Sequence, residues 1–137
     1  MQIATKTTLI KRLTKLLSPI MNYLFPEVRK GEKVYEEMSM NIIANIMGLG
    51  NAATPMGLKA MKSLQKINNN KETLSNSMAM FIVINTASLQ IIPTTIIAIR
   101  TSMNSNNPTG MIVPIWISSL TALICAISAT KILSKKY

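Results

Sequence analysis

The sequence predicts an all-α integral membrane protein with a basic amphipathic N-terminal helix, a broken re-entrant helical hairpin and two transmembrane helices. Three long runs contain no charged side chain, namely residues 38–58, 73–99 and 101–130. A soluble domain rarely leaves such runs bare, because roughly a quarter of its residues are charged. The 137 residues carry 15 Lys and Arg against five Glu, a net charge of +10, and most of the basic residues flank these runs. This length suits a single domain.

The composition argues against soluble catalysis. The chain has no His, which removes the usual general base, the Ser-His-Asp triad and most zinc sites. Its single cysteine, Cys125, excludes an internal disulfide bond and any cysteine cluster. An aromatic content of 4% leaves no stacking platform for nucleic acid, so we attribute the positive charge to contact with the anionic lipid bilayer. We therefore expect no enzyme activity, no catalytic residue, no cofactor, no metal and no nucleic-acid partner.

Residues 3–25 predict an amphipathic helix. Apolar residues recur there at three- and four-residue steps, and Arg12 and Lys15 occupy the opposite side. Such a helix suits the lipid headgroup zone, although packing on the rest of the protein explains the pattern equally well. Pro19 is expected to kink the helix, and the polar residues 26–37 are expected to form a solvated connector.

Residues 34–68 predict a re-entrant hairpin of two helices. Gly48 and Gly50 interrupt the uncharged run in its middle. The helix before this break, about residues 34–47, would measure about 21 Å at 1.5 Å per residue, which is short of the roughly 30 Å hydrocarbon core of a bilayer. Two half-length helices joined by a glycine turn favour a segment that dips into the membrane and returns. A kinked full span is the alternative.

The second helix of the hairpin is expected to restart at Thr54 and Pro55. Threonine is a good N-cap, and proline is common at the first helical position because it has no N–H to leave unpaired. The helix would then run to about residue 67 and become basic toward its end.

Two transmembrane helices are predicted after the hairpin. The first covers residues 73–100 and is expected to kink at Pro93, because proline leaves the carbonyl four residues earlier without its helical donor. The second covers residues 111–131 and carries a small residue at every fourth position. Such a stripe lets another helix approach closely. The stripe, predicted to be a packing surface, consists of Ser118, Ala122, Ala126 and Thr130.

The positive-inside rule orients these segments. With the C-terminal tail in the cytoplasm, two full spans place residues 101–110 outside and residues 59–71 inside. A re-entrant hairpin then keeps the N-terminal region inside as well, so that fourteen of the 15 basic residues are cytoplasmic and only Arg100 is outside. A full span in place of the hairpin would move seven of those fourteen outside. The charge distribution therefore favours the hairpin, with both terminal regions cytoplasmic.

The hairpin tip, facing the kinked helix, is the candidate site for a small polar solute. Broken helices that meet polar side chains near the bilayer midplane form the binding sites of many transporters. Uncharged amides and hydroxyls suit a nucleoside, a sugar-like solute or water better than a metal ion. Alternatively, these groups hydrogen-bond to one another and hold the hairpin in place. The candidate residues are Asn45, Asn51, Thr54, Asn85, Thr86 and Gln90.

Two classes of function follow from these features. The interrupted hairpin and the kink at Pro93 favour a transporter or channel component that moves a small polar solute. The small-residue stripe on the last helix favours a scaffold subunit, one that assembles with a partner membrane protein or as a homo-oligomer and transports nothing itself. The sequence features leave both classes open.

The stretch GLGNAATPMGLKAM, within residues 41–65, and the stretch NTASLQIIPTTIIAIR, residues 85–100, resemble the spore maturation branch of the nucleoside-recognition, or gate, family of membrane proteins. Residues 16–28 are similar to the lead-in of that family, so the resemblance covers nearly the whole chain. It implies a single gate-type domain over residues 1–137 that lacks the additional N-terminal hydrophobic segments of the family. It also implies a role in spore core maturation and dehydration, in the plasma membrane of a sporulating bacterium, with spore maturation protein B as a companion.

Overall fold

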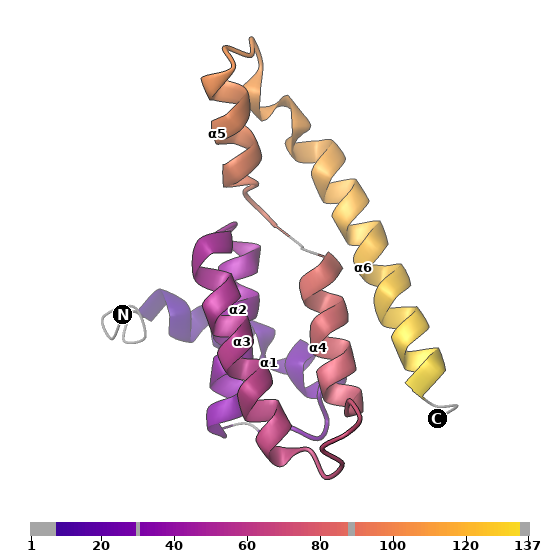
Figure 1. The fold of residues 1–137 in the computed structure, drawn as a ribbon. Helices are drawn as coiled ribbons and strands as arrows, with labels where there is room; N and C mark the ends of the chain where they lie inside the picture. The colour runs from indigo at the N-terminus through magenta and orange to yellow at the C-terminus, as the bar shows by residue number, and fades with distance from the viewer. Residues whose placement is uncertain (1–7, 30, 88–89, 135–137) are drawn as a thin grey trace.

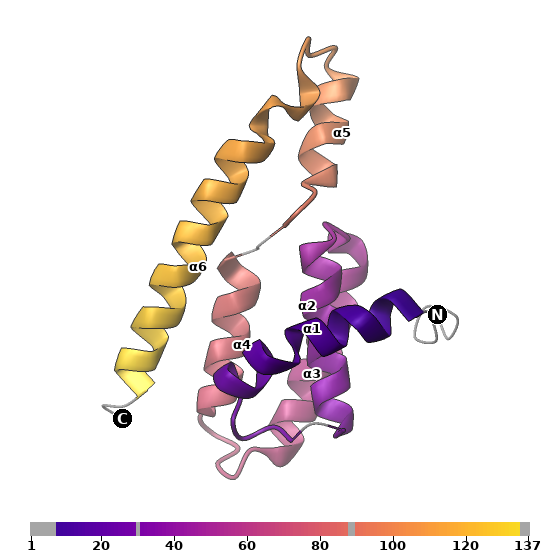
Figure 2. The same ribbon diagram turned by 180° about the vertical axis from the view of Figure 1, so that it is seen from behind.

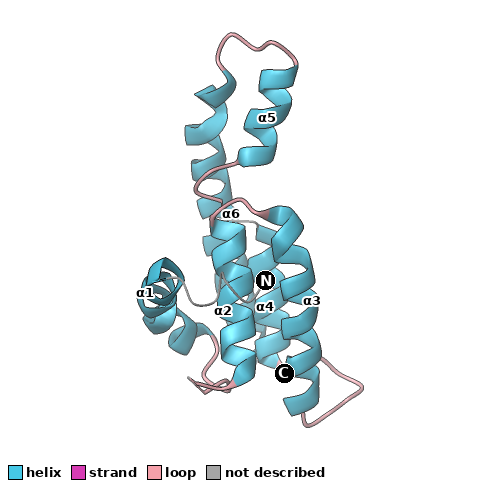
Figure 3. Cartoon of the chain, turned by 90° about the vertical axis from the view of Figure 1, so that its left-hand side faces the viewer, coloured by secondary structure: helices cyan, strands magenta, loops and turns pink. Residues whose placement is uncertain are grey.

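The computed structural model describes residues 8–29, 31–87 and 90–134, and every element within them is helical (Figures 1 and 3). This confirms the predicted all-α class. The elements are α1 (Thr8–Leu24), α2 (Lys33–Ile46), α3 (Gly50–Ile67), α4 (Asn76–Ala87), α5 (Thr94–Ser102), the 3-10 helix η2 (Pro108–Met111) and α6 (Ile112–Ser134).

The helices α2 and α3 form an antiparallel hairpin and make the most extensive contact between any two described elements (Figure 3). The chain reverses over residues 47–49, where Gly48 adopts a left-handed φ of +71°. The face that α3 turns toward α2 is made of small residues at helical spacing, Ala53, Gly57 and Ala60, and the two alanines are fully buried. A Cβ on Gly57 would lie 2.8 Å from Nδ2 of Asn41 on α2. Small side chains therefore set how closely the two helices approach.

The start of α3 corrects one expectation. The helix begins at Gly50 with Leu49 as its N-cap residue, not at Thr54 and Pro55. The N–H groups of Ala52 and Ala53 both donate to the carbonyl of Leu49 at 2.9 Å. This turn is already complete before the proline, whose missing N–H removes a single helical hydrogen bond, and so the helix continues through Pro55.

The predicted continuous helix over residues 73–100 is also corrected. The structure has two separate helices there, α4 of 12 residues and α5 of 9 residues. At 1.5 Å per residue they measure about 18 Å and 14 Å, so neither crosses a bilayer alone. Pro93 is the N-cap residue of α5. Proline disfavours a helical conformation in the residue before it, which explains why the chain stays unwound up to this position.

The helix α6 is the one described helix long and apolar enough to cross a membrane; the apolar stretch spans Pro108–Ser134. Its 23 residues correspond to about 34 Å at 1.5 Å per residue. Figure 1 shows its C-terminal half beside α4 and its N-terminal half extending past the hairpin, next to α5. Leu123 and Ile127 face inward, but no residue of α6 is fully buried. Most of this helix therefore has no covering protein in the described part of the chain.

The N-terminal helix is confirmed over residues 8–24, and the predicted residues 3–7 lie outside the described chain. It runs across the hairpin rather than along it (Figure 2). Met21 and Phe25 are fully buried, and the Phe25 ring meets that of Phe81 edge to face with centroids 6.4 Å apart. Leu16, by contrast, is 72% exposed. The end of α1 thus anchors to the protein core, while Leu16 in the middle of the helix is exposed to the surroundings.

The helix α2 begins at Lys33, close to the predicted start at about residue 34. The predicted solvated connector over residues 26–37 is corrected at its end, because Glu37 lies within α2 with only 8% of its surface exposed. The side chain of Glu37 faces α3 rather than solvent, because it accepts a hydrogen bond from Ser63 Oγ at 2.5 Å.

Candidate functional site

Two interruptions of helical structure meet at one point in the fold. We call this point the crossing; it consists of the hairpin turn, residues 47–49, and the unwound segment, residues 90–93. The N–H of Ile91 donates to the carbonyl of Ile46, and Thr94 Oγ1 donates to the carbonyl of Gly48, both at 2.8 Å. A Cβ on Gly48 would lie 2.0 Å from the carbonyl oxygen of Ile92. Only glycine permits both the left-handed turn and this close backbone contact.

The helix α6 also contacts the crossing. The indole Nε1 of Trp116 donates to the carbonyl of Ile91 at 2.8 Å. Backbone groups that leave a helix must find other partners where water is scarce, and they do so here through the turn, a threonine hydroxyl and an indole. The crossing is therefore a hydrogen-bonded junction of three segments distant in sequence.

A chain of asparagine amides lies beside the crossing. Asn41 Nδ2 donates to the carbonyl of Ala53 on α3 at 2.8 Å, and Asn45 Nδ2 donates to Asn85 Oδ1 on α4 at 2.8 Å. Asn45 also lies at the 3.5 Å limit of a hydrogen bond to Asn41 Oδ1. Asn85 Nδ2 in turn donates to the carbonyl of Phe81 at 2.8 Å. These amides link α2, α3 and α4, and each of the named donors is used within the protein.

The structure brings together two of the six residues predicted for a solute site, Asn45 and Asn85. Asn51 is exposed in the first turn of α3. The hydroxyls of Thr54 and Thr86 donate to the carbonyls one turn earlier in their own helices and are exposed. The remaining candidate, Gln90, is half-buried in the unwound segment.

The predicted helix over residues 73–100 would place Thr86 and Gln90, four residues apart, on one face, and the structure contradicts this. The helix α4 ends at Ala87, and Gln90 has no helical conformation. The two residues are four apart in sequence, but the helix that would place them on one face has already ended before Gln90.

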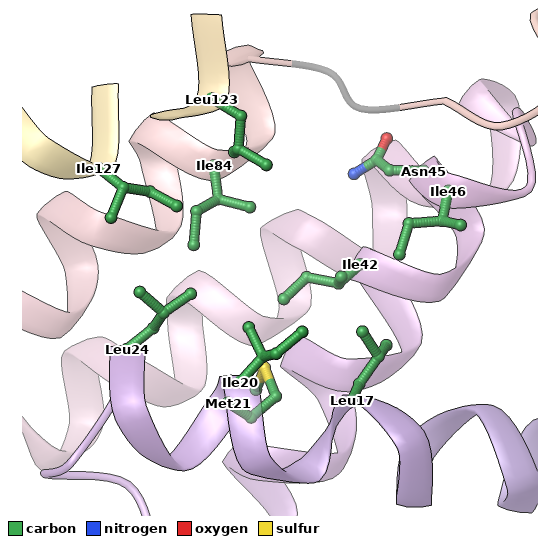
Figure 4. Close-up of a pocket in the computed structure, with 10 residues that line it drawn as sticks. All are labelled: Leu17, Ile20, Met21, Leu24, Ile42, Asn45, Ile46, Ile84, Leu123 and Ile127. Atoms are coloured by element: carbon green, nitrogen blue, oxygen red, sulfur yellow. The ribbon is translucent and has the colours of Figure 1, made fainter. Parts of the chain in front are cut away.

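A small apolar pocket of about 120 Å³ lies beside the amide chain, and Figure 4 shows the side chains that line it. They come from α1, α2, α4 and α6, and Asn45 is the only polar residue among the ten. Pockets that bury a drug-sized ligand usually measure about 300–1,000 Å³. This pocket is therefore too small and too apolar to hold a nucleoside by itself.

The predicted packing stripe on α6 is covered only in part. Ser118 and Ala122 are exposed, whereas Ala126 and Thr130 are half-buried. The hydroxyl of Thr130 donates to the carbonyl of Ala126 within the helix at 2.8 Å. The close helix contact that the described chain does make uses the small residues of α3, a pattern equally visible in the sequence at positions 53, 57 and 60.

Sequence reasoning missed Asn41 and Trp116 as site residues. Asn41 is 1% exposed and precedes Asn45 by one helical turn, so an i, i+4 pair of amides on one face was the available signal. The position of Trp116 near one end of the predicted span is typical of an interface anchor, and nothing local in the sequence reveals its bond to the unwound segment, because that partner lies 25 residues away.

A buried carboxylate was missed as well. Glu37 Oε2 accepts the hydroxyl of Ser63, and Lys59 Nζ lies 3.4 Å from Oε1. The Lys59 side chain is 66% exposed, and Oε1 accepts no hydrogen bond within the described structure. Because Lys59 is largely exposed, its ion pair with Glu37 contributes little to stability. The hydroxyl of Ser63 is therefore the main partner of the carboxylate.

The chain is similar to a known protein family and to a known protein. A family model named Gate and described as nucleoside recognition matches residues 1–103. Spore maturation protein A of Bacillus subtilis (strain 168) is 38% identical over 129 residues. That alignment covers 94% of this chain and 64% of the relative, so the chain spans less than two thirds of the relative's length. No solved structure matches the chain.

Proposed function

Because the chain belongs to the nucleoside-recognition, or Gate, family, we propose that it is a sporulation membrane protein that acts in spore core maturation. It is a component of a transporter or channel for a small polar solute such as a nucleoside. The observation that carries this proposal is the crossing, where two interrupted helical segments are joined through their backbones. Unwound backbone of this kind near the bilayer midplane is a common basis of transporter sites.

The helix ends at the crossing support a polar solute. Both helices that leave it, α3 and α5, begin there. The first N–H groups of a helix have no partner within the helix, and the helix dipole makes this end partly positive. Two such ends beside each other favour a solute with oxygen acceptors. Carbonyl or hydroxyl oxygens of a nucleoside meet that requirement.

The membrane topology that we propose places the crossing within the bilayer. The helix α6 spans the membrane, the α2–α3 hairpin enters from the cytoplasmic side and returns, and α4 and α5 together form a broken span. The basic residues Lys62 and Lys66 at the end of α3 and Lys131 near the end of α6 then lie at the cytoplasmic face. Residue Asn106 lies outside.

A second polypeptide completes the site in this proposal. The described pocket is small, and α5 and α6 carry exposed apolar side chains, such as Ile99 at 53% and Ile117 at 64%. A membrane protein like spore maturation protein B is the partner that we propose, and a second copy of the chain is the alternative.

Solute flux tests the proposal. The full chain, co-reconstituted with its companion in liposomes, should take up labelled nucleoside, and Asn45→Ala or Asn85→Ala should reduce the uptake at least tenfold. The matched control is Asn51→Ala, which removes an exposed amide near the same turn and should leave uptake unchanged. Elution of each variant as the same complex shows that folding is intact. Uptake that is equal in all three variants, or absent throughout, contradicts the proposal.

A scaffold without transport is the second candidate, favoured by the exposed half of the α6 stripe. In that case Ser118→Leu with Ala122→Leu should abolish co-purification with the companion. Ile132→Leu, at a position that is 70% exposed on the same helix, serves as the control and should co-purify normally. Association that survives the double replacement removes the basis of the scaffold function.

A further inference from the structure

An open apolar groove of about 350 Å³ lies beneath the first half of α1. Each of the described residues that line it is apolar, and the groove adjoins the smaller pocket of Figure 4 through two shared residues, Leu17 and Ile46. The principal lining residues are Leu13 and Leu16 of α1, Ile43 of α2, Met47 of the turn, and Ile91 and Ile92 of the unwound segment.

The groove lies where the burial of α1 decreases from its C-terminal end toward its middle. Met21, near its C-terminal end, is buried in the core at 1% exposure, while Leu16 is 72% exposed. On the opposite wall, Ile91 and Ile92 are 54% and 52% exposed. A space with such walls offers water no hydrogen-bonding partner, and leaving it unfilled forfeits the dispersion contacts of every lining side chain. A hydrocarbon chain matches this open space and its apolar described lining.

Basic side chains beside the groove favour a lipid with an anionic headgroup. Arg12 and Lys15 are exposed on α1, each next in sequence to a groove-lining leucine. The sequence of α1 contains no acidic residue. Guanidinium and ammonium groups at this position complement a phosphate with a net negative charge.

We propose that this groove binds one anionic phospholipid, with an acyl chain between α1 and the crossing and the headgroup phosphate on Arg12 and Lys15. The proposal rests on the membrane insertion that the proposed function assumes. The bound chain contacts Met47 and the unwound segment, so it supports the crossing. Solute flux is therefore expected to depend on anionic lipid.

Lipid binding to the purified full chain in mild detergent tests the inference. Native mass spectrometry with equal amounts of phosphatidylglycerol and phosphatidylcholine should show one phosphatidylglycerol retained per chain. Arg12→Gln with Lys15→Gln should reduce the preference roughly 30-fold, which is about 2 kcal/mol at 1.4 kcal/mol per factor of ten. The matched control, Lys62→Gln with Lys66→Gln, removes two exposed charges from α3 and should retain the lipid.

A second readout locates the acyl chain. Trp116 is the only tryptophan of the chain and donates to the carbonyl of Ile91, a groove residue. One equivalent of phosphatidylglycerol brominated on its acyl chain should quench the Trp116 fluorescence, and the Arg12 and Lys15 double variant should abolish the quenching. Retention without quenching would place the lipid on surface charge alone and overturn the groove site.

Two further outcomes are decisive. Disulfide formation between two Leu16→Cys chains in a Cys125→Ser background would show a second copy over the groove and overturn the inference. Equal loss of lipid in both double-charge variants would show nonspecific attraction and overturn it too. Failure of the proposed function appears differently, as absent solute flux while one lipid remains bound.

Discussion

The replacement Gly48→Ala tests the crossing directly. Gly48 has a φ of +71°, and its Cα faces the carbonyl of Ile92 so closely that a Cβ would lie 2.0 Å from the oxygen. Alanine at this position therefore suffers both the strain of a left-handed backbone and a steric clash with the Ile92 carbonyl, a backbone group that cannot move like a flexible side chain. The clash is relieved only if the hairpin turn separates from the unwound segment.

The expected loss of stability follows from the backbone strain and from the clash. A left-handed conformation costs a non-glycine residue roughly 1–2 kcal/mol. Separation of the turn breaks the hydrogen bonds that Ile91 and Thr94 donate to it, each of which contributes about 1 kcal/mol. The free energy of unfolding should therefore fall by about 3–4 kcal/mol.

Replacement of two other glycines separates the cost of backbone strain from the cost of the clash. Gly31 has a φ of +94° and open space at its Cβ position, so Gly31→Ala should cost only the roughly 1–2 kcal/mol of backbone strain. Gly50 has open space and no positive φ, so Gly50→Ala should not destabilise. Unfolding by SDS of the purified chain in mild detergent, followed by Trp116 fluorescence, gives the three values. A Gly48→Ala loss no larger than that of Gly31→Ala would refute the crossing.

Three further replacements probe the contacts around the crossing and the hairpin. Asn41→Ala removes the hydrogen bond that α2 donates to the Ala53 carbonyl of α3 and should cost about 0.5–1.5 kcal/mol in SDS unfolding, whereas Asn51→Ala should cost nothing measurable; equal effects would contradict the amide chain. Ser63→Ala removes the hydroxyl donated to buried Glu37 and should cost about 1.5–3 kcal/mol, because hydrogen bonds to charged groups are the stronger ones; an unchanged midpoint would show that the carboxylate has another partner. Trp116→Phe keeps the ring but loses the indole donor, and should cost about 1 kcal/mol when unfolding is followed by circular dichroism; a stabilised variant would argue against that bond.

The sequence predicted the elements whose causes are local. Charge-free runs, the basic amphipathic pattern before residue 25 and the glycine interruption at Gly48 each depend on neighbouring residues, and the structure has α6, α1 and the hairpin turn where these signals occur. The small residues Ala53, Gly57 and Ala60 of α3 have helical spacing in the sequence, as do those of the more regular stripe on α6. That stripe is covered in the described chain only at Ala126 and Thr130.

The errors share a different cause. Thr54 and Pro55 have good start signals for a helix, yet the turn at Leu49 already supplies two hydrogen bonds, so the helix begins earlier. The break between α4 and α5 depends on partners more than 40 residues away, because Ile91 and Thr94 bond to the hairpin turn. Neither partner can be found from local propensity.

The same dependence on distant partners explains why the candidate site was predicted only in part. Amide side chains in an uncharged helix signal a polar function, but whether they face a solute or one another depends on the packing of α2, α3 and α4. Asn45 and Asn85 face each other. These two predicted ligands thus stabilise the junction, and the solute in our proposal meets the helix ends and a partner chain.

Labelling of single cysteines from each side of the membrane tests the central claim most directly, namely that the hairpin enters the bilayer and returns to the same face. Asn22, Asn69 and Asn106 are exposed, and each is replaced by cysteine in a Cys125→Ser background. The account predicts that Asn22→Cys and Asn69→Cys react only from the cytoplasm and that Asn106→Cys reacts only from outside. Reaction of the Asn22 and Asn69 positions from opposite faces would contradict it.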